Sequence, residues 1–174
     1  MTNISVLGCI LLLAGLAASA AHAEETLPKG IIKLNGQSAP PLALKNLDGE
    51  LYDLAKSRGK WAFVHFWASW CGPCRKEMPT IQNIATTFKD SNLDIVLINT
   101  AEDEDTIFNF MGIVAPDLDT LMDVDGLVTE HWKPRALPET YLVDDKGRLR
   151  YMVFGGRPWD QPEYIDFLKR ISQN

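Results

Sequence analysis

Cysteine is scarce in this chain of 174 residues, which contains only Cys9, Cys71 and Cys74. Cys9 lies in an apolar N-terminal segment, so only Cys71 and Cys74 remain if that segment is removed. These two lie three residues apart and would close a loop too short to stabilise much, which excludes a long-range disulfide framework. The domain must therefore rely on its hydrophobic core for stability, and the remaining pair is free to react.

Positive charge is also in short supply. Seventeen Lys and Arg residues against 23 Asp and Glu give a net charge of −6 and a pI near 5.0, which gives no electrostatic support to nucleic-acid binding. The densest acidic piece, AEDEDT at 101–106, is expected to be a solvated helix start. The sequence contains no internal repeats and no low-complexity tracts. Its hydrophobic content of 46% is sufficient to form the core of one globular domain.

Charge is missing altogether from residues 4–21, which read ISVLGCILLLAGLAASAA. AHA and EE follow, and the A-x-A pattern favours signal-peptide cleavage after Ala23. The run of about 18 apolar residues could instead stay as an N-terminal membrane anchor. We therefore predict a signal peptide or uncleaved anchor over 1–23, a flexible leader over 24–34 and an exported domain over 35–174.

The rest of the sequence alternates predicted strands and helices. In the first half we expect a hairpin over 42–54, a buried strand over 61–67, a helix over 72–90 kinked at Pro79 and a buried strand over 93–100. In the second half we expect a helix over 105–114, a short strand and a short helix over 120–132, a hairpin over 139–155 and a final helix over 161–172. This order predicts an α/β fold with a mixed central β-sheet, helices on both faces and an N-terminal β-hairpin.

The stretch FWASWCGPC places the cysteine pair between a predicted strand and a predicted helix. At the helix start, free backbone N–H groups and the helix dipole favour the thiolate form of Cys71 and make it a nucleophile. Cys74, one turn further on, can attack a mixed disulfide formed at Cys71. Gly72 permits close approach of a substrate backbone, Pro73 suits the first helical turn, and Trp70 offers an apolar wall.

A C-x-x-C motif also occurs in zinc sites, but these need about four ligands. Beyond the two cysteines, the mature chain offers His65 and His131 and no second C-x-x-C motif. Redox chemistry is therefore favoured over structural zinc and no metal site is predicted, with His131 expected at the surface.

The motif FWASWCGPC, with Pro79 five residues after Cys74, resembles the active site of thioredoxins. The export segment, the N-terminal hairpin, the segment at 101–115 and LPETYLVDDKGRL are similar to the TlpA/ResA branch, which includes cytochrome c maturation reductases. The resemblance covers roughly residues 35–172. It implies a thioredoxin fold with an inserted βα-type segment, and a redox-active Cys71–Cys74 disulfide in place of any other cofactor.

The resemblance also implies roles for single residues. Pro138 in LPET matches the family's cis-proline, packed against the C-x-x-C motif, and Leu137 would offer backbone groups to the substrate. Glu77 matches the acid in CxxCxxE, which could tune the thiol pKa values or accept a proton; an exposed acid of the first helical turns is the alternative.

His65 departs from the pattern, because thioredoxins carry a buried Asp at this position and the branch often has Asn. It could serve as a proton relay for Cys74, although a hydrogen-bonded core histidine is the favoured interpretation. Trp159, in GGRPWDQPE, is expected to pack against the last helix rather than to contact substrate.

The leading functional hypothesis is a periplasmic thiol-disulfide oxidoreductase that reduces disulfides of exported protein substrates, in which Cys71 attacks and Cys74 resolves. The resemblance implies a DsbD/CcdA-type membrane electron donor as a partner. The alternative is a copper-handling metallochaperone module for oxidase assembly, since two thiolates bind Cu(I) well; dedicated relatives, however, use a wider C-x-x-x-C spacing. A peroxiredoxin-like peroxidase is disfavoured. Those enzymes have a Thr three residues before the reactive Cys and a Pro between the two, whereas this chain has Ala68-Ser69-Trp70 before Cys71.

Overall fold

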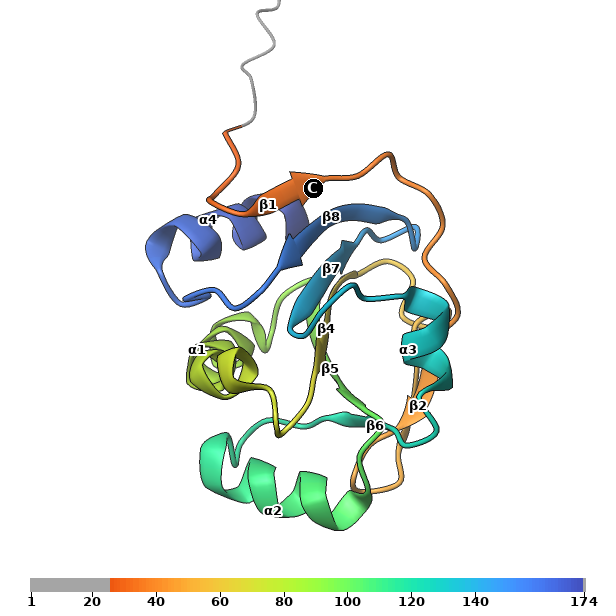
Figure 1. The fold of residues 1–174 in the computed structure, drawn as a ribbon. Helices are drawn as coiled ribbons and strands as arrows, with labels where there is room; N and C mark the ends of the chain where they lie inside the picture. Colours follow the sequence, from red (N-terminus) through yellow and green to blue (C-terminus); the bar gives the residue numbers. More distant parts are fainter. Residues whose placement is uncertain (1–25, 174) are drawn as a thin grey trace, which may run out of the picture.

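The computed structural model describes residues 26–173 (Figure 1). The predicted export segment over 1–23, with Cys9, lies outside the described residues. Within 26–173, no helix combines the length and the apolar character needed to cross a membrane.

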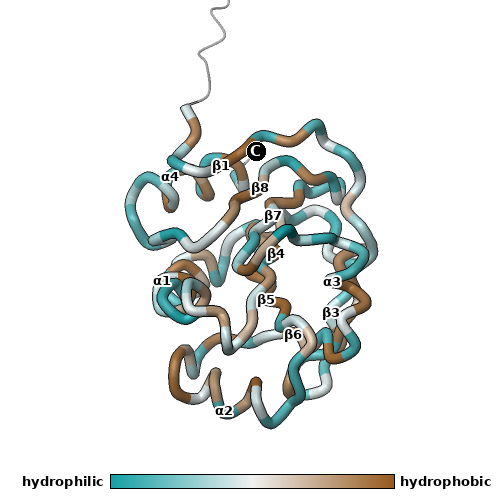
Figure 2. The backbone as a smooth tube through the Cα atoms, viewed as in Figure 1, coloured by the Kyte–Doolittle hydropathy of each residue, from teal (hydrophilic) through white to brown (hydrophobic). Residues whose placement is uncertain are grey.

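A mixed six-stranded sheet forms the centre of the domain, in the order β1-β8-β7-β4-β5-β6. The strands are β1 (Ile31–Lys33), β4 (Trp61–Trp67), β5 (Leu93–Thr100), β6 (Leu121–Asp123), β7 (Glu139–Val143) and β8 (Leu149–Phe154). β4 pairs parallel with β5 and antiparallel with β7. Every residue of β4 is buried, which explains its continuous apolar run. Figure 2 shows hydrophobic residues gathered along these central strands.

Helices cover both faces of the sheet, as predicted (Figure 1). One face carries α1 (Gly72–Phe88), α2 (Glu104–Val114) and α4 (Pro162–Ser172), whose buried residues join one hydrophobic core. The other face carries α3 (Leu127–Trp132) and the hairpin of β2 (Ala43–Lys45) and β3 (Leu51–Asp53). The segment at 101–115, which resembles the TlpA/ResA branch, contains α2.

The helix that carries the cysteine motif begins immediately after β4. Cys71 caps its N-terminus, Pro73 lies in the first turn, and the helix continues through Pro79 to Phe88. The buried strand therefore fixes the place of the cysteines at one end of the sheet.

The expected flexible leader over 24–34 is wrong at its C-terminal end. Residues 31–33 form β1 and pair antiparallel with β8, so that Ile31 faces Val153. Ile31 is buried, and the Tyr164 hydroxyl donates a hydrogen bond to the Lys29 carbonyl oxygen at 2.9 Å. A strand of three residues is too short for its alternation of polar and apolar residues to be recognised in the sequence.

Candidate active site

Cys71 and Cys74 form a disulfide at the N-terminus of α1. The Cys71 sulfur accepts a hydrogen bond from the backbone N–H of Cys74 at 3.2 Å, so it lies at the positive end of the helix dipole, which favours thiolate after reduction. Cys71 is 4% exposed and Cys74 is completely buried. An external sulfur can therefore approach Cys71 first.

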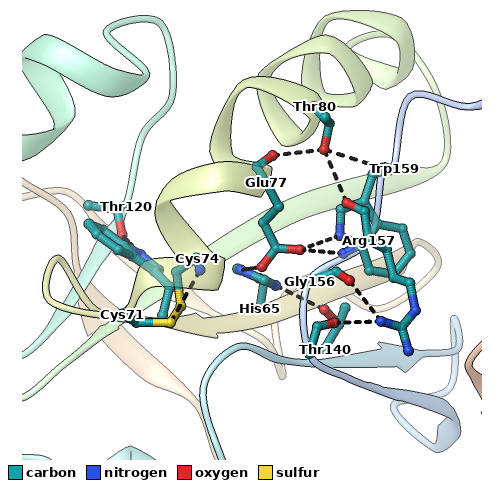
Figure 3. A network of polar contacts seen from close by, with 12 residues as sticks. His65, Cys71, Cys74, Glu77, Thr80, Thr120, Thr140, Gly156, Arg157 and Trp159 are labelled. Carbon is teal, nitrogen blue, oxygen red and sulfur yellow. Dashed lines mark hydrogen bonds and ion pairs between the residues drawn. A yellow bond between two sulfur atoms is a disulfide. The ribbon is translucent and has the colours of Figure 1, made fainter.

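Glu77 lies one turn beyond Cys74 on the same helix face. Its side chain is buried, which excludes the exposed alternative. Carboxylate Oε2 accepts hydrogen bonds from the backbone N–H of Arg157 at 3.0 Å and from the Trp159 indole N–H at 3.1 Å. Figure 3 shows the carboxylate between these donors and the His65 ring. Two donors on one oxygen leave Oε1 directed at the imidazole.

His65 lies in β4 and is completely buried. Its Nε2 is 3.3 Å from Glu77 Oε1, close enough for an ion pair although the two atoms are not aligned as a hydrogen bond. Its Nδ1 is 2.9 Å from the Thr140 hydroxyl oxygen, because the register of β4 and β7 places the two residues opposite each other. The favoured interpretation, a hydrogen-bonded core histidine, is confirmed, and the ring also contacts an acid beside the cysteines.

Three of the residues predicted to bind substrate, Trp70, Gly72 and Pro73, directly flank Cys71 in the chain. Trp70 is 70% exposed, and Gly72 and Pro73 are also exposed at the helix start. The Leu137–Pro138 peptide bond is cis, as predicted, and the Pro138 carbonyl accepts a hydrogen bond from Gly155 at 2.9 Å. Trp70, Gly72 and Pro73 therefore form an exposed rim beside the buried disulfide, whereas Leu137 is half-buried and Pro138 is buried.

Trp159 is completely buried and packs edge-on against Phe63 and Tyr164, which confirms the prediction of a packing residue. Its hydrogen bond to Glu77 was not expected, and the same holds for the bond between Thr140 and His65. No local sequence signal marks either contact, because each joins residues more than 70 positions apart.

The acidic segment 101–106 begins a helix as expected, with Asp103 as its N-cap. Glu102, however, is not merely solvated. Its carboxylate accepts hydrogen bonds from the backbone N–H and the hydroxyl of Ser69 and from the Asn99 side chain. Glu102 therefore fixes the loop immediately before Cys71.

His131 is exposed, as predicted. Across residues 26–173, three or more His, Cys, Asp or Glu side chains never gather in an arrangement suited to a metal ion.

Comparison with known proteins agrees with this geometry. Residues 35–152 match the sequence model of the AhpC/TSA family. The thiol-disulfide oxidoreductase ResA of Bacillus subtilis (strain 168) is 32% identical over 120 residues, which cover 69% of this chain and 67% of that protein. ResA of Bacillus thuringiensis subsp. konkukian (strain 97-27) is 27% identical over 137 residues, which cover 79% of this chain and 78% of that protein.

A crystal structure of a putative thiol:disulfide interchange protein DsbE from Chlorobium tepidum superposes with a TM-score of 0.67 at 25% identity, covering 80% of this chain and 94% of that chain. The predicted thioredoxin fold is thereby confirmed, and the names of the relatives do not favour the copper-handling alternative. The match over more than half of the chain and the likeness to ResA show that the chain belongs to the AhpC/TSA family and is a thioredoxin-like thiol-disulfide oxidoreductase.

Proposed function

We propose that this enzyme reduces disulfide bonds of exported proteins by dithiol exchange at Cys71 and Cys74. The observation that carries the proposal is the difference in burial between Cys71 and Cys74 at the start of α1. Cys71 is positioned to meet a substrate, and Cys74 lies behind it, where it can react only with a sulfur already bonded to Cys71.

The reaction has two exchange steps. The Cys71 thiolate attacks one sulfur of the substrate disulfide, which breaks, and the other substrate sulfur leaves as a thiolate that takes up a proton. Cys74 then loses its proton and attacks Cys71, which releases the second substrate thiol and forms the Cys71–Cys74 disulfide. Two electrons pass from the enzyme to the substrate, so a dithiol donor must reduce the enzyme before the next turnover.

Glu77 and His65 are the groups that would receive the proton of Cys74. Glu77 shares a helix face with Cys74, and its Oε1 faces the imidazole in a site almost free of solvent. Trp70, Gly72 and Pro73 would contact the substrate, and the backbone at Leu137 and Pro138 would bind it in extended form.

The sequence supports a compartment and an electron donor for this proposal. The uncharged run over 4–21 supports export, with a periplasmic domain that is either released by cleavage near Ala23 or anchored in the membrane. The resemblance to the TlpA/ResA branch supports a DsbD/CcdA-type membrane protein as the electron donor.

The test is the reduction potential of the Cys71–Cys74 pair, measured on the purified protein in glutathione buffers. A potential near that of thioredoxin, about −270 mV, is expected for a reductase, whereas about −120 mV would make the protein an oxidant and refute the proposed direction. Incubation of reduced Cys74→Ser with extracts of exported proteins should then accumulate mixed disulfides at Cys71. Cys71→Ser is the matched control, and equal trapping by both variants would refute the assigned roles.

A further inference from the structure

One edge of the central sheet is only partly covered. β5 runs from Leu93 to Thr100, but its outer neighbour β6 pairs only with Ile98, Asn99 and Thr100. Along the remaining five residues, 93–97, β5 pairs with β4 on its inner side, and no other strand in residues 26–173 pairs with its outer side. Such an edge presents backbone N–H and C=O groups to whatever lies beside it, except that the Leu97 carbonyl already accepts a hydrogen bond from the Thr120 hydroxyl at 3.4 Å.

This edge lies in a groove rather than on a flat surface. A cavity of ≈ 560 Å³ is lined by residues 93–97 together with Ala85 and Phe88 of α1 and with Glu50 and Tyr52 of the hairpin. In Figure 1, β5 lies between α1 on one side and the hairpin on the other. An extended segment that enters the groove would therefore lie along the strand edge between two walls.

The two walls differ in chemistry. On the α1 side, Leu93, Ile95 and Leu97 join the same apolar cluster as Ala85 and Phe88. The hairpin side carries the exposed Glu50 beside Leu51 and Tyr52. Asp94 points away from the apolar cluster toward Lys60, with which it is paired at 3.2 Å.

The end of the groove carries further negative charge. Asp119 bonds the side-chain amide of Asn46 there, and Lys89 is the one cation in the lining that the structure describes. A second cavity of ≈ 400 Å³ shares Asn46, Glu50 and Asp119 and adds Asp48 and Asp117. One wall of the lining is therefore apolar, and acidic side chains lie on the other wall, at Glu50, and at the end of the groove, at Asp119.

We infer that the groove binds an extended basic segment of a partner protein, which adds to the free edge of β5 as a further strand. Side chains of a strand alternate between its two faces. The bound segment would thus place apolar side chains against α1 and Lys or Arg side chains toward Glu50 and Asp119. Backbone hydrogen bonds would supply affinity for the segment, and the alternation of apolar and basic side chains would determine which sequences bind.

The end of the groove at Phe88 lies far from the disulfide. Cys71 caps the N-terminus of α1 and Phe88 ends it, and a helix of 17 residues is about 25 Å long. A partner held in the groove would leave Cys71 accessible, so binding and disulfide exchange are separable, and the inference does not depend on the direction of electron transfer proposed above.

The experiment uses ¹⁵N-labelled oxidised protein and a short capped peptide of alternating Lys and Val. We expect shifts of the amide signals of 93–97 and slower hydrogen exchange of those N–H groups that point outward. Binding should weaken with added salt. A peptide of alternating Glu and Val, and a Lys–Val peptide with N-methylated backbone, should not bind.

Glu50→Lys should weaken binding of the Lys–Val peptide about three- to tenfold, since it replaces an attraction with a repulsion. Glu163→Lys on α4 is the charge-matched control and should bind as the unaltered protein does. Binding of the acidic peptide with equal affinity, signal changes confined to other residues, or a dimer that closes over the same edge in sedimentation experiments would overturn the inference.

Discussion

The contact between His65 and Glu77 predicts a measurable energetic coupling. His65→Asn removes the imidazole, and the shorter Asn side chain is expected not to reach the carboxylate. Glu77 Oε1, which accepts no hydrogen bond in the folded protein, would then also lose the imidazole that faces it at 3.3 Å, while Oε2 keeps its hydrogen bonds from Arg157 and Trp159. Residues in contact interact by about 0.5–3 kcal/mol, and we expect the loss of this electrostatic contact to cost about 1–2 kcal/mol because the second oxygen stays bonded.

The coupling itself comes from a double-mutant cycle of His65→Asn and Glu77→Gln. The Gln side chain retains an oxygen for the two donors and removes the charge that faces the imidazole. Groups in contact show coupling energies of about 0.5–3 kcal/mol, whereas distant pairs are additive within about 0.5 kcal/mol.

Urea unfolding of the oxidised proteins measures the four free energies, since the disulfide stays intact throughout. The m-value must stay constant for the comparison to hold. His131→Asn is the control, because His131 is exposed and its substitution should add independently to Glu77→Gln. A coupling below about 0.5 kcal/mol between His65 and Glu77 would show that the 3.3 Å contact contributes nothing, and the proton-relay proposal would lose its structural basis.

Three further predictions concern single side chains. Burial alone would raise the pKa of Asp144, but hydrogen bonds from Arg148, Arg150 and Lys146 together outweigh it and lower the pKa. The stabilisation is therefore complete above about pH 4 and is lost as pH falls through the folded-state pKa. Urea unfolding should accordingly show that the difference in stability between wild type and Asp144→Asn narrows below about pH 4. Thr140→Val removes the hydroxyl bonded to the buried imidazole and should shift the pH profile of mixed-disulfide resolution in stopped-flow assays, whereas Thr140→Ser should preserve the profile; identical profiles for both would contradict this role. Trp159→Phe deletes the indole N–H bonded to Glu77 and should cost about 1.5–3 kcal/mol in urea unfolding, and a loss no larger than about 0.5 kcal/mol would show that this bond is not stabilising.

The sequence predicts the parts of the fold whose patterns are long enough to be distinctive. The seven buried residues of β4 and the helical spacing of α1 are such patterns, and both elements lie where expected. β1 has three residues and is held by pairing with β8, more than 100 positions away, so no local pattern reveals it.

The same reasoning applies to the active site. Cys71, Cys74 and Glu77 are predictable because one helix and its motif fix their spacing. The partners of Glu77 come from other elements, and their approach depends on strand register and on the loop before α4. Sequence reasoning could therefore identify the acid but not the groups that orient it.

The hydrogen bonds to Glu77 also impose an order on biosynthesis. Arg157 and Trp159 lie 80 and 82 positions after Glu77, so they leave the ribosome and cross any membrane well after the cysteines. A newly made chain can thus expose both thiols before the acid beside them is anchored. A chain that stops before Arg157 would keep the complete C-x-x-C motif yet hold Glu77 without two of its donors, and its thiols would react in a different environment from those of the mature protein.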